Sequence, residues 1–392
     1  MANLTTLSDI LKTQYIGPLN EQINQQCKLL NRVERIKDEI VTGKNFTLPL
    51  HISRNEGVGA KAEGANLPTA GAQGYKDSIF PMRYLYGVIT VSGQSIAATK
   101  NSEGAFLRAV DSEMKGVTKD LKADLNRMLY GDGSGALAAA TANATASTTV
   151  TVDSTAKLRV GMKIDIISGT TASVSGAAIT AINSATSFTH NGTAAAVAAS
   201  SKVYKAGAKD IEVMGLAGIV SATDPISTGL QGLPVATNPY WKASVLANSG
   251  TNRSLSLALM RTALDTVETA GNGKTTAIYT THGVRRAYEA LLQADRKYVN
   301  TMKLDGGIET LAYDNLPIIA DKDCQANKLY FVDESELVFA ELGEGGFQWM
   351  DEDGAILSRN GKDAYDAVLY RYCELATRAR NAHCLLADIT EA

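Results

Sequence analysis

Two stretches decide the fold of this chain: FTLPLHI at residues 46–52 and LYGDGSG at residues 129–135. In the first, large apolar residues alternate with Thr47, Pro49 and His51, which is the period of a β-strand with one buried face. The alternation resumes from Ile79 to Val91 and predicts a return strand. Because proline cannot donate a hydrogen bond to a neighbouring strand, Pro49 places the first strand at a sheet edge.

The loop between these strands, Ser53 to Ser78, is unusually long. It has 26 residues, with five Gly and five Ala, and its only larger apolar residues are Val58, Leu67 and Tyr75. Structureless loops of this length are uncommon in compact domains, and an isolated two-stranded ribbon is marginal in water. We therefore predict that the ribbon is an arm that lies on another molecule. A merely mobile surface loop is the alternative.

A long helix is predicted from Ser102 to Tyr130. Ser102 is a good N-cap, and Glu103 places a carboxylate near the positive end of the helix dipole. At a rise of about 1.5 Å per residue, the helix is roughly 40 Å long. Gly131 is expected to close it in the left-handed conformation, followed by turn residues at 132–135. One narrow apolar stripe recurs at spacings of three and four residues: Phe106, Val110, Met114, Val117, Leu121, Leu125 and Met128.

Composition indicates a large globular protein. The 392 residues are enough for two or three cores, 45% are apolar, and the net charge of −3 argues against binding nucleic acid through a basic surface. The sequence has no secretory signal and no apolar run of membrane-spanning length, which predicts no membrane association and synthesis in a cytoplasm. Four cysteines lack metal-binding or disulfide spacing and are expected to be reduced and partly buried: Cys27, Cys324, Cys373 and Cys384.

The segments on either side of the ribbon and helix differ in composition. Residues 1–44 carry helical apolar spacing interrupted at Gly17 and Pro18, which predicts an N-terminal arm with one or two helices. Residues 141–205 are rich in Ala, Thr, Ser and Gly, and alternating pieces such as residues 162–167 predict a small β-rich insertion. A flexible low-complexity linker is the alternative for this segment.

The second half of the chain mixes helices and strands, so the fold class is predicted to be α+β. Helices are expected at 255–268 and 283–292, the first ended by Gly271. Residues 366–389 are ambiguous between helix and strand, but their alternation suits a long strand followed by a turn at Asn381. Short strands are predicted at 277–281, 308–313, 317–320, 328–332 and 337–340.

No segment carries the pattern of a catalytic site, so we predict no enzyme activity, no cofactor, no metal and no catalytic residue. The sequence GNGKT at 271–275 resembles the end of a phosphate-binding loop, but Glu268 stands where the first glycine is needed, and the loop follows a helix rather than a strand. Asp132 and Ser134 lack the partners of a calcium loop or a nucleophile turn, and the acidic run at 351–353 is typical of a solvated loop. The histidines are isolated from one another and from acidic clusters: His51 on an exposed strand face, His282 near a helix start, His190 and His383.

The order and lengths of these parts resemble those of the major capsid proteins of tailed bacteriophages, which have the Hong Kong 97-like fold. The resemblance rests on the N-terminal arm, the hairpin with its Gly/Ala-rich tip, the helix closed by LYGDGSG at 129–135 and the segment LAYDNLPII at 311–319. It covers nearly the whole chain apart from 141–205. The divisions that it implies are an N-terminal arm at 1–44, an extended E-loop at 45–95, a P-domain with the spine helix at 96–140, a β-rich insertion domain at 141–205, mainly A-domain at 206–345 and C-terminal P-domain strands at 346–392.

The resemblance also implies a function and partners. The protein would assemble into hexamers and pentamers of an icosahedral shell and enclose double-stranded DNA without sequence-specific binding. Its partners would be other copies of itself, a separate scaffolding protein, a portal protein and, in some members, a decoration protein. It would reside in the virion after assembly in the host cytoplasm. Some members crosslink subunits through an E-loop lysine, but Lys61 and Lys76 are interpreted as solvated, and no crosslink is predicted.

Three other functions remain open on the sequence. An encapsulin-type compartment shell has the same fold, but a short or absent E-loop and a shorter chain would favour it, and neither is seen. A hydrolase whose insertion is a carbohydrate-binding module would need convergent Asp, Glu or His residues, which the sequence does not identify. A tail or adhesin protein would be expected to repeat the insertion, which occurs once.

Overall fold

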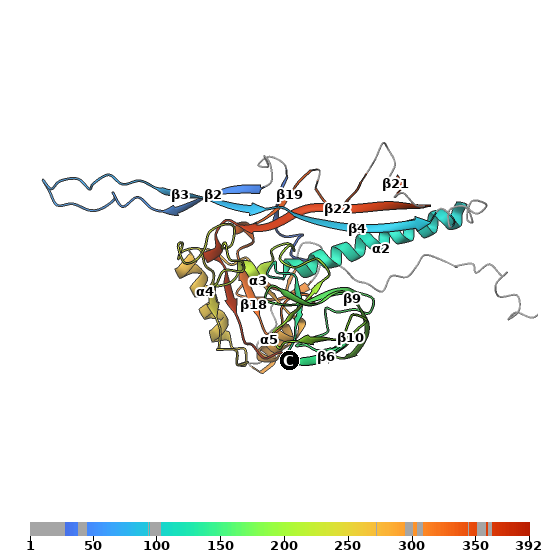
Figure 1. Cartoon of the computed structure of the whole chain (residues 1–392). Coiled ribbons are helices and arrows are strands. Elements are labelled where there is room, and N and C mark those ends of the chain that lie inside the picture. The colour runs from blue at the N-terminus through green and yellow to red at the C-terminus, as the bar shows by residue number, and fades with distance from the viewer. Residues whose placement is uncertain are drawn as a thin grey trace, which may run out of the picture.

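The computed structural model describes residues 28–37, 45–92, 94, 103–271, 273–294, 301–303, 309–343, 345–350, 358–359 and 363–392. Helices and strands mix throughout these residues, so the predicted α+β class is confirmed. A long sheet with a helix along one face runs across the molecule, and two smaller parts lie on the helix side of it (Figure 1). A slender two-stranded arm projects from one end (Figure 1).

The long sheet, here called the spine sheet, is built around β22 (Ala364–Thr377). On one side β22 pairs with β4 (Arg83–Ser92) along the whole of β4. On its other side β22 pairs with three strands: β19 (Leu337–Glu341), β20 (Gln348–Trp349) and β21 (Ser358–Arg359). The long strand predicted for residues 366–389 is therefore confirmed, and it is the central strand of this sheet.

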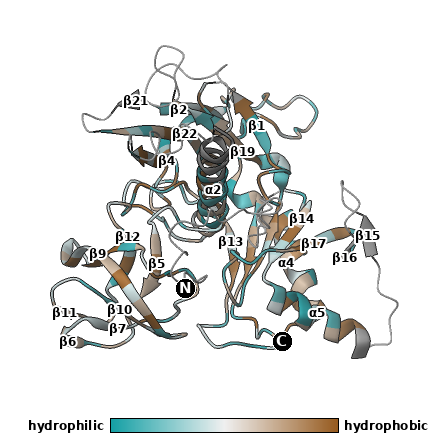
Figure 2. Cartoon of the chain, turned by 90° about the vertical axis from the view of Figure 1, so that its right-hand side faces the viewer, coloured by the Kyte–Doolittle hydropathy of each residue, from teal (hydrophilic) through white to brown (hydrophobic). Residues whose placement is uncertain are grey.

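The predicted long helix is confirmed as α2 (Glu103–Leu129), which lies along the spine sheet (Figures 1 and 2). Leu125 of the predicted apolar stripe is fully buried. Helix and sheet approach closely at Gly87, where a Cβ atom would come within 2.6 Å of Val117 Cγ1. A larger residue at 87 would therefore push the helix off the sheet. The stripe positions Phe106 and Val110 lie outside the part whose side chains the structure describes.

The end of α2 differs from the prediction that Gly131 adopts the left-handed conformation. Gly133 and Gly135 adopt it instead, with φ of +77° and +80°. The reason at Gly135 is steric as well, because a Cβ atom there would lie 2.5 Å from the Ala208 carbonyl oxygen. The turn character of 132–135 is confirmed by Asp132 Oδ1, which accepts a hydrogen bond from Ser134 N at 3.0 Å.

The N-terminal segment 28–37 is not the helix that its apolar spacing predicts. It forms a buried turn and then β1 (Glu34–Lys37), which runs parallel to β19. Leu29 and Val33 are buried in the main core, and Arg32 makes two hydrogen bonds to Glu334, at 2.6 and 2.8 Å. The apolar residues with helical spacing therefore lie in a single turn, from which they pack into the main core. Residues 1–27 and 38–44 of the predicted arm lie outside the described residues.

A second sheet forms one of the two smaller parts. Its helices, α4 (Leu257–Gly271) and α5 (His282–Ala294), confirm the two predicted ones and pack on it around Met260, Val267 and Tyr288 (Figure 2). Its strands, in spatial order, are β13 (Ser244–Leu246), β23 (Cys384–Leu386), β18 (Leu329–Val332), β14 (Ala277–Thr280), β17 (Leu316–Ala320), β16 (Glu309–Tyr313) and β15 (Thr301–Lys303).

The C-terminal strands divide between the two sheets, although the sequence resemblance placed 346–392 in one domain. β22 belongs to the spine sheet, whereas β23 pairs with β18 and β13 in the second sheet. A short 3₁₀ turn, η2 (Arg380–Ala382), joins them and contains the predicted turn residue Asn381. The end of the chain thus ties the two sheets together.

The Ala/Thr/Ser-rich segment is a folded β module, so the linker alternative is wrong. Its core contains Val150, Ile164, Phe188 and Val203, each 0% exposed. The module begins at β5, before the predicted boundary at 141, because β5 pairs with β12. Its sheet contains, in spatial order, β5 (Ala136–Ala139), β12 (Lys202–Lys205), β8 (Lys163–Ser168), β9 (Thr171–Ser184), β10 (Ser187–His190) and β7 (Thr149–Thr151), and a separate pair is formed by β6 (Ala144–Ser147) and β11 (Ala195–Val197).

His383, between η2 and β23, is fully buried and makes the fold sensitive to acid. Its Nδ1 accepts a hydrogen bond from Asp333 N at 3.3 Å, and Nε2 lies 3.1 Å from Thr377 Oγ1. Burial lowers the pKa of His383 to about 4. Between pH 6.5 and 4 the unfolded chain therefore binds a proton that the folded chain does not, and stability is lost as pH falls through this window.

We predict that His383 removes roughly 3 kcal/mol of unfolding free energy as pH falls from about 6.5 to about 4. The His383→Gln variant keeps one acceptor and one donor but does not titrate, so its stability should be lower at pH 7 and flatter across this window. Urea unfolding of the unassembled proteins at a series of pH values measures the difference. Burial raises the pKa of Glu374 to about 7, but this group is common to both proteins and cancels. Parallel pH curves for the two proteins would contradict the prediction.

Candidate assembly surfaces

The arm is formed by β2 (Asn45–Ser53) and β3 (Gly74–Pro81), which pair only with each other among the described strands. The edge position inferred from Pro49 is therefore confirmed. The return strand begins at Gly74, earlier than the predicted Ile79, and it is interrupted at Met82. It is interrupted because β3 pairs within the arm whereas β4 pairs with β22.

The base of the arm rests on the body of the same chain. Phe46 and Phe80 stack with ring centroids 5.5 Å apart, and both are buried against Ala340 and Ala376 of the spine sheet. Farther along the arm, Leu50 packs against Leu233 and Trp241. These apolar contacts hold the first half of β2 in place.

A loop between α3 (Leu216–Ile219) and β13 joins the arm to the spine sheet; we call residues 221–243 the bracket. Gln231 of the bracket accepts a hydrogen bond from Ile79 N at 2.9 Å through its backbone oxygen. Its side-chain Nε2 donates to Ser78 Oγ at 2.7 Å and to the Thr377 carbonyl at 3.1 Å. Its Oε1 accepts from Thr377 N at 3.2 Å. One buried amide therefore links β3 to β22.

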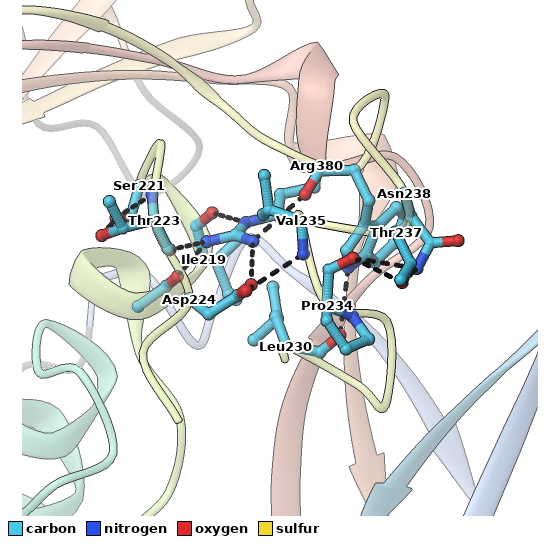
Figure 3. A network of polar contacts seen from close by, with 12 residues as sticks. Ile219, Ser221, Thr223, Asp224, Leu230, Pro234, Val235, Thr237, Asn238 and Arg380 are labelled. Atoms are coloured by element: carbon cyan, nitrogen blue, oxygen red, sulfur yellow. Dashed lines mark hydrogen bonds and ion pairs between the residues drawn. The ribbon is translucent and has the colours of Figure 1, made fainter. Parts of the chain in front are cut away.

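Arg380 anchors the bracket in turn (Figure 3). Its guanidinium is 0% exposed and lies 3.5 Å from the Asp224 carboxylate. Burial lowers the pKa of Arg380 and the charge of Asp224 opposes that change, so the side chain stays charged. Its remaining donors bind backbone carbonyls, at Ile219 (3.0 Å), Trp241 (3.2 Å), Gly218 (3.3 Å) and Thr223 (2.6 Å).

The tip of the arm, residues 54–73, contrasts with its base. It contains no helix or strand, and nearly all of its side chains are exposed. Val58 is 70% exposed and Leu67 is 86% exposed, so these apolar side chains have no core of their own. Single exposed apolar residues are common on protein surfaces, but these two stand at the end of a segment that projects from the body, where another molecule can reach them.

A second exposed surface, here called the tyrosine face, lies on the spine sheet. It consists of Tyr84, Tyr86 and Val88 of β4, which are 51–56% exposed, and Tyr370 and Tyr372 of β22. Residues on a strand alternate between faces, and Leu85 and Ile89 are buried toward α2, so the tyrosines are on the opposite face. Tyr372 is the centre, with ring centroids 5.1 Å from Tyr84, 6.1 Å from Tyr86 and 4.9 Å from Tyr370. The Tyr86 hydrogen bond and burial raise the pKa of Tyr372 to about 12, so its hydroxyl is neutral near pH 7.

The residues considered for chemistry do not converge. His51 is exposed and lies 2.7 Å from Gln73 Oε1, and His282 begins α5, both as predicted. Within the described residues, no three His, Cys, Asp or Glu side chains are grouped so that they could hold a metal. Cys324, Cys373 and Cys384 are free and buried, and Cys27 lies outside the described part. The acidic run at 351–353 is outside it as well.

The GNGKT segment has a packing role. It follows α4 and precedes β14, which is the order predicted and the reverse of a phosphate-binding loop. A Cβ atom on Gly271 would lie 2.0 Å from the Asn381 carbonyl oxygen, and one on Gly273 would lie 2.6 Å from Ala382 Cβ. These glycines therefore let η2 approach the second sheet. No described helix is long and apolar enough to cross a membrane.

The sequence predicts the arm but does not identify the residues that fix its position on the body. The bracket reads as a loop of Gly, Pro, Ser and Thr, and nothing local marks Gln231 as its link to the arm. Arg380 stands out only in retrospect, as a charged residue between a long buried strand and a short one. The tyrosine face was visible as alternating tyrosines in 84–86 and 370–372, although the sequence alone does not pair these two strands.

Known proteins resemble this chain in fold rather than in sequence. No protein-family model and no curated protein matches it. A chain of the cyanophage A-1(L) capsid asymmetric unit has a TM-score of 0.61 at 15% identity, covering 99% of this chain and 100% of that chain. A chain from the capsid of an empty GTA particle has a TM-score of 0.51 at 9% identity, with 99% of each chain covered. A chain of Gordonia phage Cozz has a TM-score of 0.50 at 11% identity, covering 97% and 92%. Over nearly its whole length, this chain has the fold of phage capsid proteins.

Proposed function

We propose that this chain is the major capsid protein of a tailed double-stranded DNA bacteriophage and that it assembles into hexamers and pentamers of an icosahedral shell. The observation that carries the proposal is the arm, which is fixed to the body at its base and bare at its apolar tip. A segment with this division of contacts suits a protein whose fold is completed by a neighbour. The match in fold to capsid chains over nearly the whole length supports the same function.

Each part of the chain takes a role in this proposal. The E-loop at 45–95 would contain the arm and continue into β4 of the spine sheet. α2 with the rest of the spine sheet corresponds to the P-domain, and the second sheet with α4 and α5 to the A-domain. Residues 1–44 are the N-terminal arm, and the β module stands as an insertion domain. In this proposal β19 of 206–345 would belong with the P-domain and β23 of 346–392 with the A-domain, because they pair with β22 and β18 respectively.

We further propose that the arm tip of one copy lies on the tyrosine face of a neighbouring copy. Val58 and Leu67 supply aliphatic side chains, and the tyrosine face supplies aromatic rings. Such a contact buries apolar area, and Val58 and Leu67 themselves bring no charge into it. A single contact of this kind is weak, but a closed shell repeats it by symmetry, and the many copies together give a stable assembly.

The other partners follow from the same function. The virion would also contain a portal protein and, where the insertion does not serve instead, a decoration protein, and a separate scaffolding protein would act during assembly in the host cytoplasm. Double-stranded DNA would be enclosed without sequence-specific binding. The net charge of −3 suits this role, because a strongly basic inner surface would resist movement of the DNA.

Electron microscopy of the purified full-length protein tests the proposed function. Closed shells of uniform size, or rings of five and six copies, are expected at high protein concentration. The second expectation is release of intact DNA-filled particles from cells that contain the remaining phage proteins. A protein that stays monomeric under all assembly conditions would contradict the proposal, and shells that fill with host proteins instead of DNA would indicate a cellular compartment.

We predict that Val58→Asp together with Leu67→Asp abolishes assembly without unfolding the subunit. Each aspartate would need to be desolvated on the neighbour, whereas both positions face water in the isolated chain. Sedimentation velocity measures assembly, and circular dichroism with urea unfolding measures the fold. The matched control is Ala60→Asp, which introduces the same charge at an exposed position of the same tip but removes only a methyl group. Normal shells from the double variant would show that the tip is not an assembly surface.

A second prediction concerns the direction of the arm. Gln231→Ala leaves Thr377 N and its carbonyl without their side-chain partners, so the free energy of unfolding should fall by about 2–3 kcal/mol. Because Gln231 also binds Ser78, the arm should become more mobile relative to the spine sheet, and assembly should slow. Hydrogen exchange of β3 in the unassembled protein reports the mobility. The control is Lys242→Gln, at an exposed residue of the bracket. It should leave the free energy of unfolding and the hydrogen exchange of β3 unchanged. Unaltered exchange in β3 of Gln231→Ala would rule out this role.

A further inference from the structure

A cavity of about 140 Å³ lies where the β module meets α2 and the second sheet. Segments from five places in the sequence form its wall, and none of them belongs to the arm or the tyrosine face. Most of its polar side chains are basic. The lining residues are Ala123, Asp124, Arg127, Leu137, Ala156, Lys157, Arg159, Met162, Lys205, Lys322 and Asp323.

One carboxylate in this cavity serves several cations. Asp124 of α2 lies 2.8 Å from Lys205, 3.7 Å from Arg159 and 4.0 Å from Arg127. Arg127 is neutralised from behind by Glu212, with two hydrogen bonds of 2.9 and 2.6 Å. A single carboxylate is thus left to balance both basic residues that reach it from the module.

Two further cations have no carboxylate of their own. Among the described residues, neither Lys157 nor Lys322 makes an ion pair within 4 Å. Lys157 is half-buried, and its pKa is lowered, first by burial and then by the charge of Arg127, while the more distant charges of Asp323, Glu212 and Asp132 only partly oppose this change. Asp323, the other carboxylate of the lining, accepts a hydrogen bond of 2.7 Å from Asn126 Nδ2. The cavity lining therefore holds more positive than negative charge; Lys157 is partly withdrawn from water, whereas Lys322 and Arg159 are exposed.

We propose that this cavity binds a small tetrahedral oxyanion, a phosphate or sulfate dianion, which bridges the β module to the body of the chain. Lys157 and Arg159 would bind it from the module, and Lys322 would bind it from the loop after β17. A dianion matches the unpaired cations, and ammonium and guanidinium groups bind such oxygens through charge-assisted hydrogen bonds. The cavity has room for several water molecules, which is enough for an anion with four oxygens.

The position of the cavity gives the anion a structural consequence. The chain enters the module just before β5 and leaves it just after β12. Arg159 and Lys205 of the module form ion pairs with Asp124 of α2. An anion that binds both Lys157 and Lys322 adds a link between the module and the second sheet. Binding therefore stabilises the docked position of the module by mass action.

Calorimetric titration of the unassembled full-length protein with inorganic phosphate, at constant ionic strength in sodium chloride, tests the proposal. Saturable binding with a stoichiometry of one per chain is expected, together with a rise in thermal transition temperature that chloride does not produce. Lys157→Met and Lys322→Met should each weaken phosphate affinity by about tenfold or more, since each removes a charge-assisted hydrogen bond from one side of the cavity. Lys202→Met removes the same charge from the same module away from the cavity and should bind phosphate normally.

Three outcomes would overturn the proposal. One is the absence of saturable phosphate binding, and another is equal affinity in wild type and both lining variants. The third separates a free anion from the phosphates of nucleic acid. A short DNA duplex is titrated in the same way. It should not displace phosphate, and any affinity of the protein for the duplex should be the same in wild type and in Lys157→Met. Duplex binding at this cavity without any response to phosphate would assign the site to nucleic acid instead.

Discussion

The ladder between β4 and β22 is the interaction on which the rest of the structure depends. β22 is paired on both edges, so its backbone N–H and C=O groups find hydrogen-bond partners in the neighbouring strands. One face of the ladder receives α2 at Gly87, and the other carries the tyrosines. At one end the chain turns out of β4 into the arm, and just past the end of β22 it turns through η2 into the second sheet. The arm, the helix and the second sheet therefore all take their positions from this one pair of strands.

Buried charges stand along β22 and fix how it pairs. Arg371 forms a buried ion pair with Glu341 and lies between the rings of Phe339 and Phe347, at 5.1 and 4.8 Å. Glu374 binds Arg83 of β4 at 3.2 Å and accepts Met214 N at 2.6 Å. A buried ion pair adds little net stability, because desolvation offsets the attraction. A shift of register by one residue would move these charges to the wrong face, so the pairs penalise misalignment of β22.

Local pattern was sufficient to predict most elements and insufficient to predict their pairing. α2, α4, α5 and β22 were predicted from sequence because each carries its period over many residues. Residues 28–37, within the arm at 1–44 for which one or two helices were predicted, form a turn and a strand, since the neighbouring β19 offers hydrogen bonds that the local apolar spacing does not reveal. β23 follows β22 closely in sequence but lies in another sheet, because its partner strands come from far away in the sequence. The assembly surfaces divide in the same way: the arm was visible as a local excess of extended chain, whereas Gln231 and Arg380 act through contacts across more than 130 residues.

The way the chain enters and leaves the β module allows the module to evolve independently of the rest of the protein. β5 leads in and β12 leads out, and the two are antiparallel neighbours, with Ala138 opposite Val203. The module closes around its own core of Val150, Ile164 and Phe188. A domain whose two ends meet side by side can be exchanged for a short turn, or for an unrelated domain, without moving the strands that flank it. The β5 and β12 junction is therefore a site at which an inserted domain can be gained, lost or replaced while the spine sheet around β22 stays unchanged.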